Sequence, residues 1–257
     1  MLTVDLRPEP PSPPPDSWEI PRGAELRATV ALLREGREVS DDAFDRVFPE
    51  PVRTFSSVHW TQVAVILRAL RMLGANENTR ILDVGSGAGK FCVVGGLVSR
   101  ARFVGVEQRQ PLVDVARALA AEYGVANATF VQGAAERLDW SGYDAIYLYN
   151  PFGELNLAPR DRISCDGELP RERYSYLVRA TQARLYLAAP GTRVVTFHGL
   201  GGPMPPGYRC LESERWYQGA LSSFVRLPHD QELLLGDRNG RASETSPSAT
   251  DLFGEQD

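Results

Sequence analysis

The chain has 257 residues, 43% of them hydrophobic, which is enough to bury one full-sized core. Its formal net charge of -5 offers no general attraction to nucleic-acid backbones or anionic lipid. The three cysteines, Cys92, Cys165 and Cys210, are irregularly spaced, which fits a reducing compartment and excludes a CxxC metal or redox site. Without a secretion signal or a long apolar run, we expect a cytoplasmic chain with no membrane contact.

The two ends of the chain differ in composition from the rest. Residues 1–22 are rich in proline, which removes backbone donors and favours extended conformations. Residues 236–257 carry small, polar and acidic residues with few apolar anchors. We therefore expect a disordered leader and a disordered tail.

A helical cap is expected over residues 23–60. It contains two short helices, at residues 24–35 and 41–48, and Ser40 is a plausible N-cap for the second. A further helix is expected over residues 61–73, because its apolar side chains recur at helical spacing.

The expected main domain covers residues 61–235, and strand-like and helical segments alternate along it. Strands are expected at residues 80–83, 103–107, 129–132, 143–149 and 193–198, and the later helices at 90–100, 111–123 and 171–187. Alternation of this kind predicts parallel strands with helices on both faces of the sheet. The last two strands, 208–216 and 220–227, are separated by three residues, which predicts an antiparallel hairpin. The fold class is therefore α/β, with a doubly wound, mostly parallel sheet.

The most informative motif is the glycine-rich turn DVGSGAG, which places Gly85, Gly87 and Gly89 between a strand and a helix. Without a Cβ atom, these residues permit positive φ and let a ligand approach the backbone closely. The helix that follows offers its N-terminal amides. Glu107 lies 22 residues beyond Gly85 and closes the next strand, where a carboxylate accepts both hydroxyls of an adenosine ribose. The combination predicts an adenosine-containing cofactor.

Other interpretations of the same residues remain open. A dinucleotide site would have the spacing GxGxxG, but here the third glycine comes one residue early. A phosphate-binding P-loop would need glycine at Val84 and a hydroxyl at Phe91. A tight turn without a ligand would not account for the acid at Glu107.

Residues 81–89 together with Glu107 resemble the first two motifs of the class I, or seven-stranded, S-adenosylmethionine-dependent methyltransferases, and the resemblance covers roughly residues 61–227. It implies a seven-stranded Rossmann-like fold with S-adenosyl-L-methionine as cofactor. It also implies that the turn contacts the methionine end, that Glu107 and its neighbour bind the ribose, and that residues after the third strand flank the adenine. The cofactor contacts it implies are Asp83, Gly85, Ser86, Gly87, Gly89, Glu107, Gln108, Gly133, Ala134, Ala135 and Glu136. Because the family often has Asp or Asn where this chain has Ala134, the adenine contact is expected from backbone amides or from Glu136.

The fourth strand ends in Asn150, Pro151 and Phe152, which are similar to the NPP[YF] motif of amino-methylating enzymes. In that motif the Asn side chain holds a planar amine and the aromatic ring stacks on it. The second proline is missing here, which disfavours methylation of a base or of glutamine. We expect Asn150 to contact substrate or cofactor and to take part in catalysis, with Phe152 and Glu154 as substrate contacts. The alternative is a turn that ends the strand.

Two further residues are candidates for the site. His198 ends the fifth strand and has a suitable unperturbed pKa for a general base, although a structural histidine is the alternative. Segments resembling residues 57–62 help close the cofactor pocket in several of these enzymes. Trp60 is therefore a candidate substrate contact, with a buried anchor at the helix entry as the alternative.

These features together predict an S-adenosylmethionine-dependent methyltransferase that acts by direct displacement on a small molecule or a protein side chain, with no metal. Nucleic acid is not an expected acceptor, given the net charge. Two other functions remain open: a noncatalytic cofactor-binding or interaction module of the same fold, and an NAD-dependent oxidoreductase.

Overall fold

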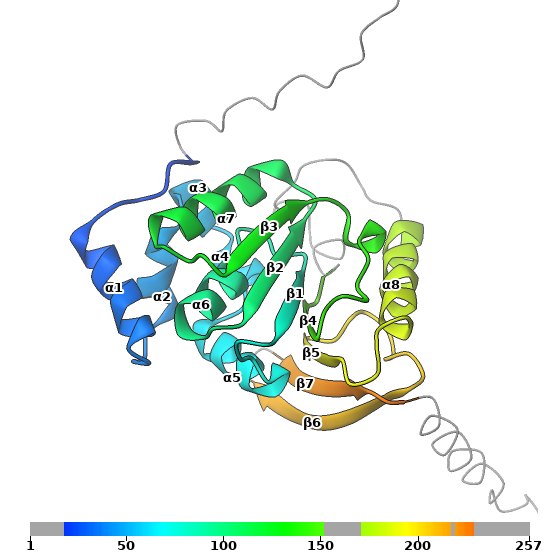
Figure 1. Cartoon of the computed structure of the whole chain (residues 1–257). Coiled ribbons are helices and arrows are strands. Elements are labelled where there is room, and N and C mark those ends of the chain that lie inside the picture. The colour runs from blue at the N-terminus through cyan, green and yellow to red at the C-terminus, as the bar shows by residue number, and fades with distance from the viewer. Residues whose placement is uncertain (1–17, 152–170, 217–218, 229–257) are drawn as a thin grey trace, which may run out of the picture.

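The computed structural model describes residues 18–151, 171–216 and 219–228, and a seven-stranded sheet runs through them (Figure 1). The strand order is β3-β2-β1-β4-β5-β7-β6. The strands are β1 (Arg80–Val84), β2 (Arg102–Glu107), β3 (Ala128–Gln132), β4 (Ala145–Tyr149), β5 (Arg193–Phe197), β6 (Tyr208–Trp216) and β7 (Gly219–Arg226). Strands β1 to β5 pair in parallel, whereas β7 is antiparallel to both β5 and β6. The expected mostly parallel sheet with a C-terminal antiparallel hairpin is confirmed.

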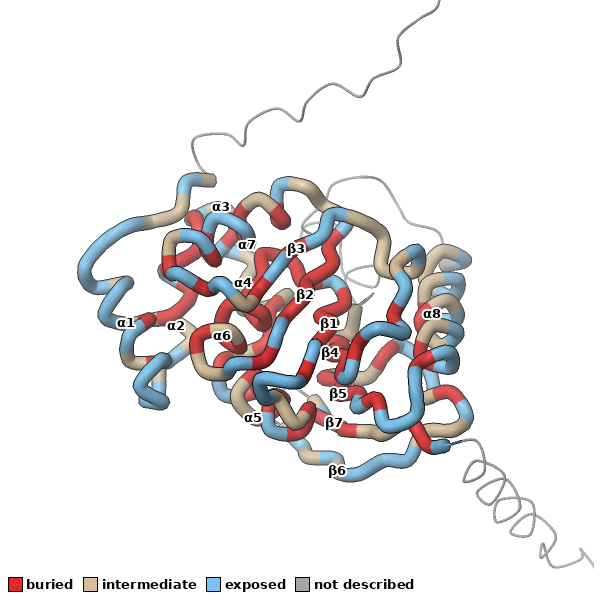
Figure 2. The backbone as a smooth tube through the Cα atoms, viewed as in Figure 1, coloured by how far each residue is buried: buried red, intermediate tan, exposed pale blue. Residues whose placement is uncertain are grey.

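The central strands are buried on both faces, as Figure 2 shows for β1, β2 and β4. Because side chains alternate along a strand, Ile81 joins one apolar cluster and Leu82 joins the other. Helices α5 (Val63–Leu73), α6 (Lys90–Val98) and α7 (Gln110–Glu122) contribute to the larger cluster, and α8 (Arg171–Tyr186) contributes to the smaller one. The sheet therefore carries helices on both faces, which explains why its strands read as continuous apolar runs.

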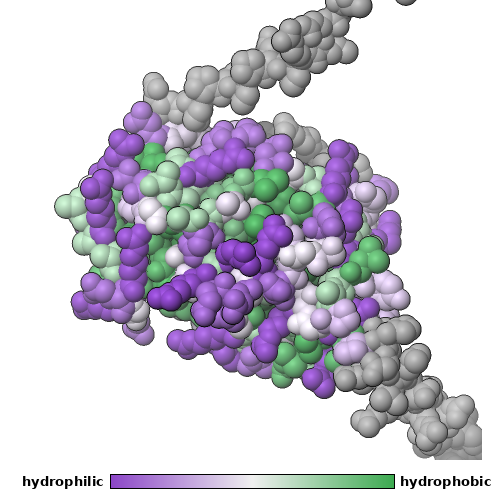
Figure 3. Space-filling view, viewed as in Figure 1, coloured by the Kyte–Doolittle hydropathy of each residue, from purple (hydrophilic) through white to green (hydrophobic). Residues whose placement is uncertain are grey.

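The described surface is mixed in character. On the face seen in Figure 3, hydrophilic side chains predominate and hydrophobic ones form small separate groups. Among the helices in the described part of the chain, none combines the length and the apolar character that crossing a membrane requires.

Short helices precede the sheet. They are α1 (Ala24–Arg34), α2 (Asp41–Phe44), the 3-10 helix η2 (Asp45–Val47), α3 (Glu50–Arg53) and α4 (Ser56–His59). Helix α1 and the pair α2–η2 lie where helices were expected, and the hydroxyl of Ser40 accepts a hydrogen bond from the Ala43 amide at 3.3 Å, which confirms the N-cap. Helices α3 and α4 were not expected, because four residues are too few to display a helical period.

A buried ion-pair cluster joins these helices to the sheet. Lys90, the first residue of α6, is 3% exposed, and its Nζ lies 2.6 Å from Asp41 Oδ1 and 2.7 Å from Asp45 Oδ1. Asp41 Oδ1 also accepts a hydrogen bond from the Val63 amide at the start of α5. Burial raises the pKa of Asp45, while the charge of Lys90 acts in the opposite direction. The cluster therefore connects α2, η2, α5 and the helix that follows Gly89.

Replacing Lys90 with methionine is expected to lower the free energy of unfolding by about 3–5 kcal/mol, because the buried carboxylate of Asp45 loses its cation. Urea unfolding measures the change. Arg46→Met is the matched control in the same region, since it breaks only the exposed ion pair with Glu25 and should cost less than about 1 kcal/mol. Equal losses in the two variants would show that the buried cluster does not hold the helices.

Candidate functional site

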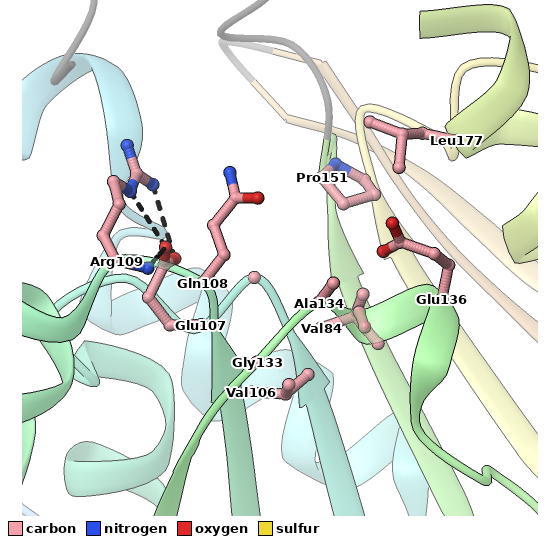
Figure 4. A pocket seen from close by; sticks show the side chains of 12 residues that line it. Val84, Val106, Glu107, Gln108, Arg109, Gly133, Ala134, Glu136, Pro151 and Leu177 are labelled. Carbon is pink, nitrogen blue, oxygen red and sulfur yellow. Dashed lines mark hydrogen bonds and ion pairs between the residues drawn. The ribbon is translucent and has the colours of Figure 1, made fainter. Parts of the chain in front are cut away.

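A pocket opens at the carboxyl ends of the parallel strands (Figure 4). This is the edge where ligands bind in doubly wound sheets. The pocket is lined by Val84, Gly85, Val106, Glu107, Gln108, Arg109, Gly133, Ala134, Ala135, Glu136, Pro151 and Leu177. Seven of these, Gly85, Glu107, Gln108, Gly133, Ala134, Ala135 and Glu136, are among the residues predicted to bind cofactor. The structure thus brings the glycine turn, the acid and the segment after β3 around one space.

The glycine turn has the backbone geometry that its sequence predicts. Gly85, Gly87 and Gly89 have φ values of 75°, 53° and 84°. At Gly85, a Cβ atom would meet nothing closer than the Pro151 carbonyl oxygen at 4.0 Å, so this side of the turn is open to a ligand. At Gly89, a Cβ atom would lie 2.8 Å from the side chains of Ala116 and Phe130, so this glycine allows close helix packing instead. Gly85 therefore leaves room for a ligand, whereas Gly89 leaves room for the packing of neighbouring side chains.

The carboxylate of Glu107 stands at the end of β2 and is 3% exposed. Its Oε1 accepts from the amide (2.9 Å) and the Nε (2.8 Å) of Arg109, and its Oε2 accepts from the Gly87 amide (3.2 Å) and Arg109 Nη2 (3.3 Å). Figure 4 shows the guanidinium folded over the acid. Since a carboxylate offers about four lone-pair directions, a ribose must displace one of these donors. Of these donors, only the Arg109 guanidinium can move away from Glu107 without a change in the backbone.

Asp83 lies in β1 behind the turn and does not line the pocket. It is 4% exposed and accepts a hydrogen bond from the Cys92 thiol, with 3.4 Å between Oδ2 and Sγ. Burial raises the pKa of Asp83 to about 7, and the nearby charge of Glu107 acts in the same direction. A buried carboxylate with so weak a donor is well suited to receive a cation.

Across the pocket from Arg109 and Gln108, the wall is built by the segment after β3 and by α8 (Figure 4). Residues Ala134, Ala135 and Glu136 surround the start of the 3-10 helix η3 (Ala135–Arg137). Arg173 Nη2 of α8 lies 3.3 Å from Glu136 Oε1, and Arg184 donates to the Glu136 carbonyl. These contacts hold α8 beside the pocket, where it contributes Leu177.

Three predicted cofactor residues of the turn itself, Ser86, Gly87 and Gly89, do not line the pocket. Ser86, 8% exposed, donates its amide to the Val106 carbonyl, and Gly87 donates its amide to Glu107. Trp60 places its indole against Gly87 and does not line the pocket.

Asn150 and His198 follow the neighbouring strands β4 and β5, and both adopt left-handed backbone conformations, with φ of 32° and 62°. Such values are uncommon for residues other than glycine and are concentrated at functional sites. The His198 ring lies 5.7 Å from the Tyr149 ring, and burial lowers the pKa of His198. Neither residue lines the pocket, although Pro151 beside Asn150 does. The predicted substrate contacts Phe152 and Glu154 lie outside the described residues.

Comparisons with known proteins agree with this arrangement. A family model described as a methyltransferase domain matches residues 75–160, and no curated protein sequence matches the chain. TrmN from Thermus thermophilus has a similar structure, with 16% identity and a TM-score of 0.52, over 68% of this chain and 52% of that chain. An RNA methyltransferase from Salinibacter ruber in complex with S-adenosyl-L-homocysteine has 23% identity and a TM-score of 0.49, over 66% of this chain and 97% of that chain.

The strand order and the similarity to TrmN show the fold of the class I methyltransferases, and the methyltransferase-domain model matches residues 75–160 within it. The resemblance that the sequence shows at the glycine turn and Glu107 is thereby confirmed.

Replacing Asp83 with asparagine is expected to stabilise the ligand-free chain at pH 8, on the order of 2 kcal/mol. The folded pKa lies above the unfolded value, so the wild-type chain loses stability as pH rises from about 4 to about 7. The advantage of the variant should therefore shrink toward pH 5, in urea unfolding followed across this range. Asp42→Asn, at an exposed position, should change little with pH. A pH-independent advantage at Asp83 would contradict the expectation.

Proposed function

We propose that this chain binds S-adenosyl-L-methionine in the pocket and transfers its methyl group to a small molecule or a protein side chain. One observation carries the proposal: the open side of the glycine turn at Gly85 and the buried carboxylate of Glu107 face the same pocket. Methyl transfer agrees with the methyltransferase-domain match over residues 75–160. The net charge of -5 disfavours a nucleic-acid acceptor.

The residues of the site fit the parts of this cofactor. Gly85 leaves the turn accessible to the methionine end, and the ionised form of Asp83 would attract the ammonium group. Glu107 would accept the ribose hydroxyls. A Cβ atom at Gly133 would meet nothing within 4 Å, so the adenine has room there beside Glu136.

The bound cofactor supplies an activated methyl group on sulfur, so the protein has to align an acceptor, exclude water and remove a proton where the acceptor carries one. Asn150 and His198 follow β4 and β5, at the carboxyl ends of the strands, where ligands bind in doubly wound sheets. Because burial lowers its pKa, His198 is neutral at pH 7 and can accept a proton. Phe152 and Glu154 are proposed as acceptor contacts.

Two other functions remain candidates and make different predictions. An NAD-dependent oxidoreductase would be stabilised by NAD, and a noncatalytic module would bind the methyl donor without turnover. Thermal unfolding with S-adenosyl-L-homocysteine and with NAD separates the cofactors, because a ligand that binds only the folded state raises apparent stability. Stabilisation by NAD alone would refute the proposal. Labelled methyl donor offered to a cell extract then separates the enzyme from the module.

The variant Glu107→Gln is expected to bind S-adenosyl-L-homocysteine at least about 10-fold more weakly than the wild-type chain, because the ribose loses a charged acceptor. Isothermal titration calorimetry measures the change. Glu77→Gln, on the exposed loop before β1, is the matched control and should bind like the wild-type chain. Unchanged affinity of Glu107→Gln for S-adenosyl-L-homocysteine would show that Glu107 does not bind the ribose.

Arg109→Gln is expected to change stability and affinity in opposite directions. The ligand-free variant should be less stable, because buried Glu107 loses its counter-ion, yet it should bind S-adenosyl-L-homocysteine several-fold more tightly. The reason is that the ribose no longer displaces the guanidinium. Thermal unfolding and calorimetry give the two quantities. Weaker binding would show instead that Arg109 contacts the ligand directly.

A further inference from the structure

The indole of Trp60 presents an unsatisfied donor to the glycine turn. Its Nε1 is enclosed, and no residue that the structure describes accepts a hydrogen bond from it. The whole side chain is 8% exposed, and its ring packs on Phe48 with 4.5 Å between centroids. Because buried polar groups are nearly always hydrogen-bonded, such an orphan indicates a partner that is not part of the described chain.

The direction of this donor identifies the place where the partner would bind. Nε1 and Cδ1 lie 3.3 Å and 3.7 Å from the position that a Cβ atom would take on Gly87. The polar edge of the indole therefore faces the turn, not the Phe48 ring. Helix α6, nine residues long, begins directly after this turn and offers free amides to an anion. An indole N–H only donates, so the partner must be an acceptor.

The surrounding charges favour a carboxylate as this acceptor. Lys90, the only lysine in the sequence, is already paired with Asp41 and Asp45, so the indole N–H and the backbone amides are the donors at the turn. Asp83, in β1 just before the turn, provides the opposite character, a buried acid suited to an ammonium group. A donor and an acid on either side of one glycine turn match the two charged groups of a free amino acid.

We infer that Trp60 Nε1 donates a hydrogen bond to the carboxylate of the amino-acid portion of the methyl donor. This inference rests on the proposed function, since S-adenosyl-L-methionine carries such a group at its methionine end. Because Nε1 is enclosed, the ring tilts away from Gly87 to admit the carboxylate. Trp60 is then a residue that selects ligands with a free amino-acid carboxylate, and not only a packing anchor.

The test compares two ligands that differ only in this carboxylate. Trp60→Phe keeps an aromatic ring against Phe48 and removes the donor. Calorimetry with S-adenosyl-L-homocysteine should show binding weakened by about 10-fold or more, as for a lost hydrogen bond to a charged group. Binding of S-adenosyl-3-thiopropylamine, which keeps the amine and lacks the carboxylate, should change by less than about 2-fold. Trp216→Phe, on edge strand β6 and separated from β1 by three strands, is the matched control and should bind both ligands as the wild-type chain does.

Each outcome decides between the possibilities. An equal loss for both ligands in Trp60→Phe would overturn the inference in favour of a packing role, and so would unchanged binding of S-adenosyl-L-homocysteine. If the wild-type chain itself fails to bind S-adenosyl-L-homocysteine, the proposed function fails first. Should Trp60→Phe not fold, the indole N–H resonances of the ¹⁵N-labelled wild-type chain give the answer: one should shift downfield with S-adenosyl-L-homocysteine and not with the decarboxylated ligand.

Discussion

The buried carboxylate of Glu107 is the constraint on which the site depends. Its hydrogen bond from Gly87 fixes the glycine turn to the end of β2, and its bond from the Arg109 amide fixes the start of α7. The Arg109 side chain donates two further hydrogen bonds to the carboxylate. One acid thus organises three segments of the pocket, and the donors that surround it compensate for its removal from water.

Most of the fold could be predicted because hydrophobic periodicity reflects burial directly. The strands at residues 80–83 and 193–198 were placed within one residue of their observed ends. The strand expected at 143–149 begins instead at Ala145, since Tyr143 lies under the Arg80 guanidinium, 4.5 Å from its ring centroid, and not in the sheet. In sequence, Tyr143 resembles the tyrosines within β4, and only its contact with Arg80 in the folded chain shows that it lies outside the strand.

The site was predictable where a motif fixes the spacing of its residues, and not where a side chain reaches the pocket through tertiary packing. The turn from Gly85 to Gly89 and the acid Glu107 follow from spacing alone. Arg109 and Leu177 line the pocket but were not foreseen. A basic residue two positions after the acid was the only available signal for Arg109. The position of Leu177 depends on how α8 packs, which its sequence does not specify.

The N-terminal helices and the glycine turn are joined by direct side-chain contacts. Phe48 supports the Trp60 ring against Gly87, and Asp41 and Asp45 hold the lysine that follows Gly89. A ligand that contacts both parts recognises only molecules in which these helices are docked. Binding of such a ligand therefore also stabilises the docking of the helices on the sheet. Because this coupling is reciprocal, a change that weakens helix docking weakens ligand binding as well. The short helices before the sheet are in this sense part of the binding equilibrium, although most of them lie away from the pocket.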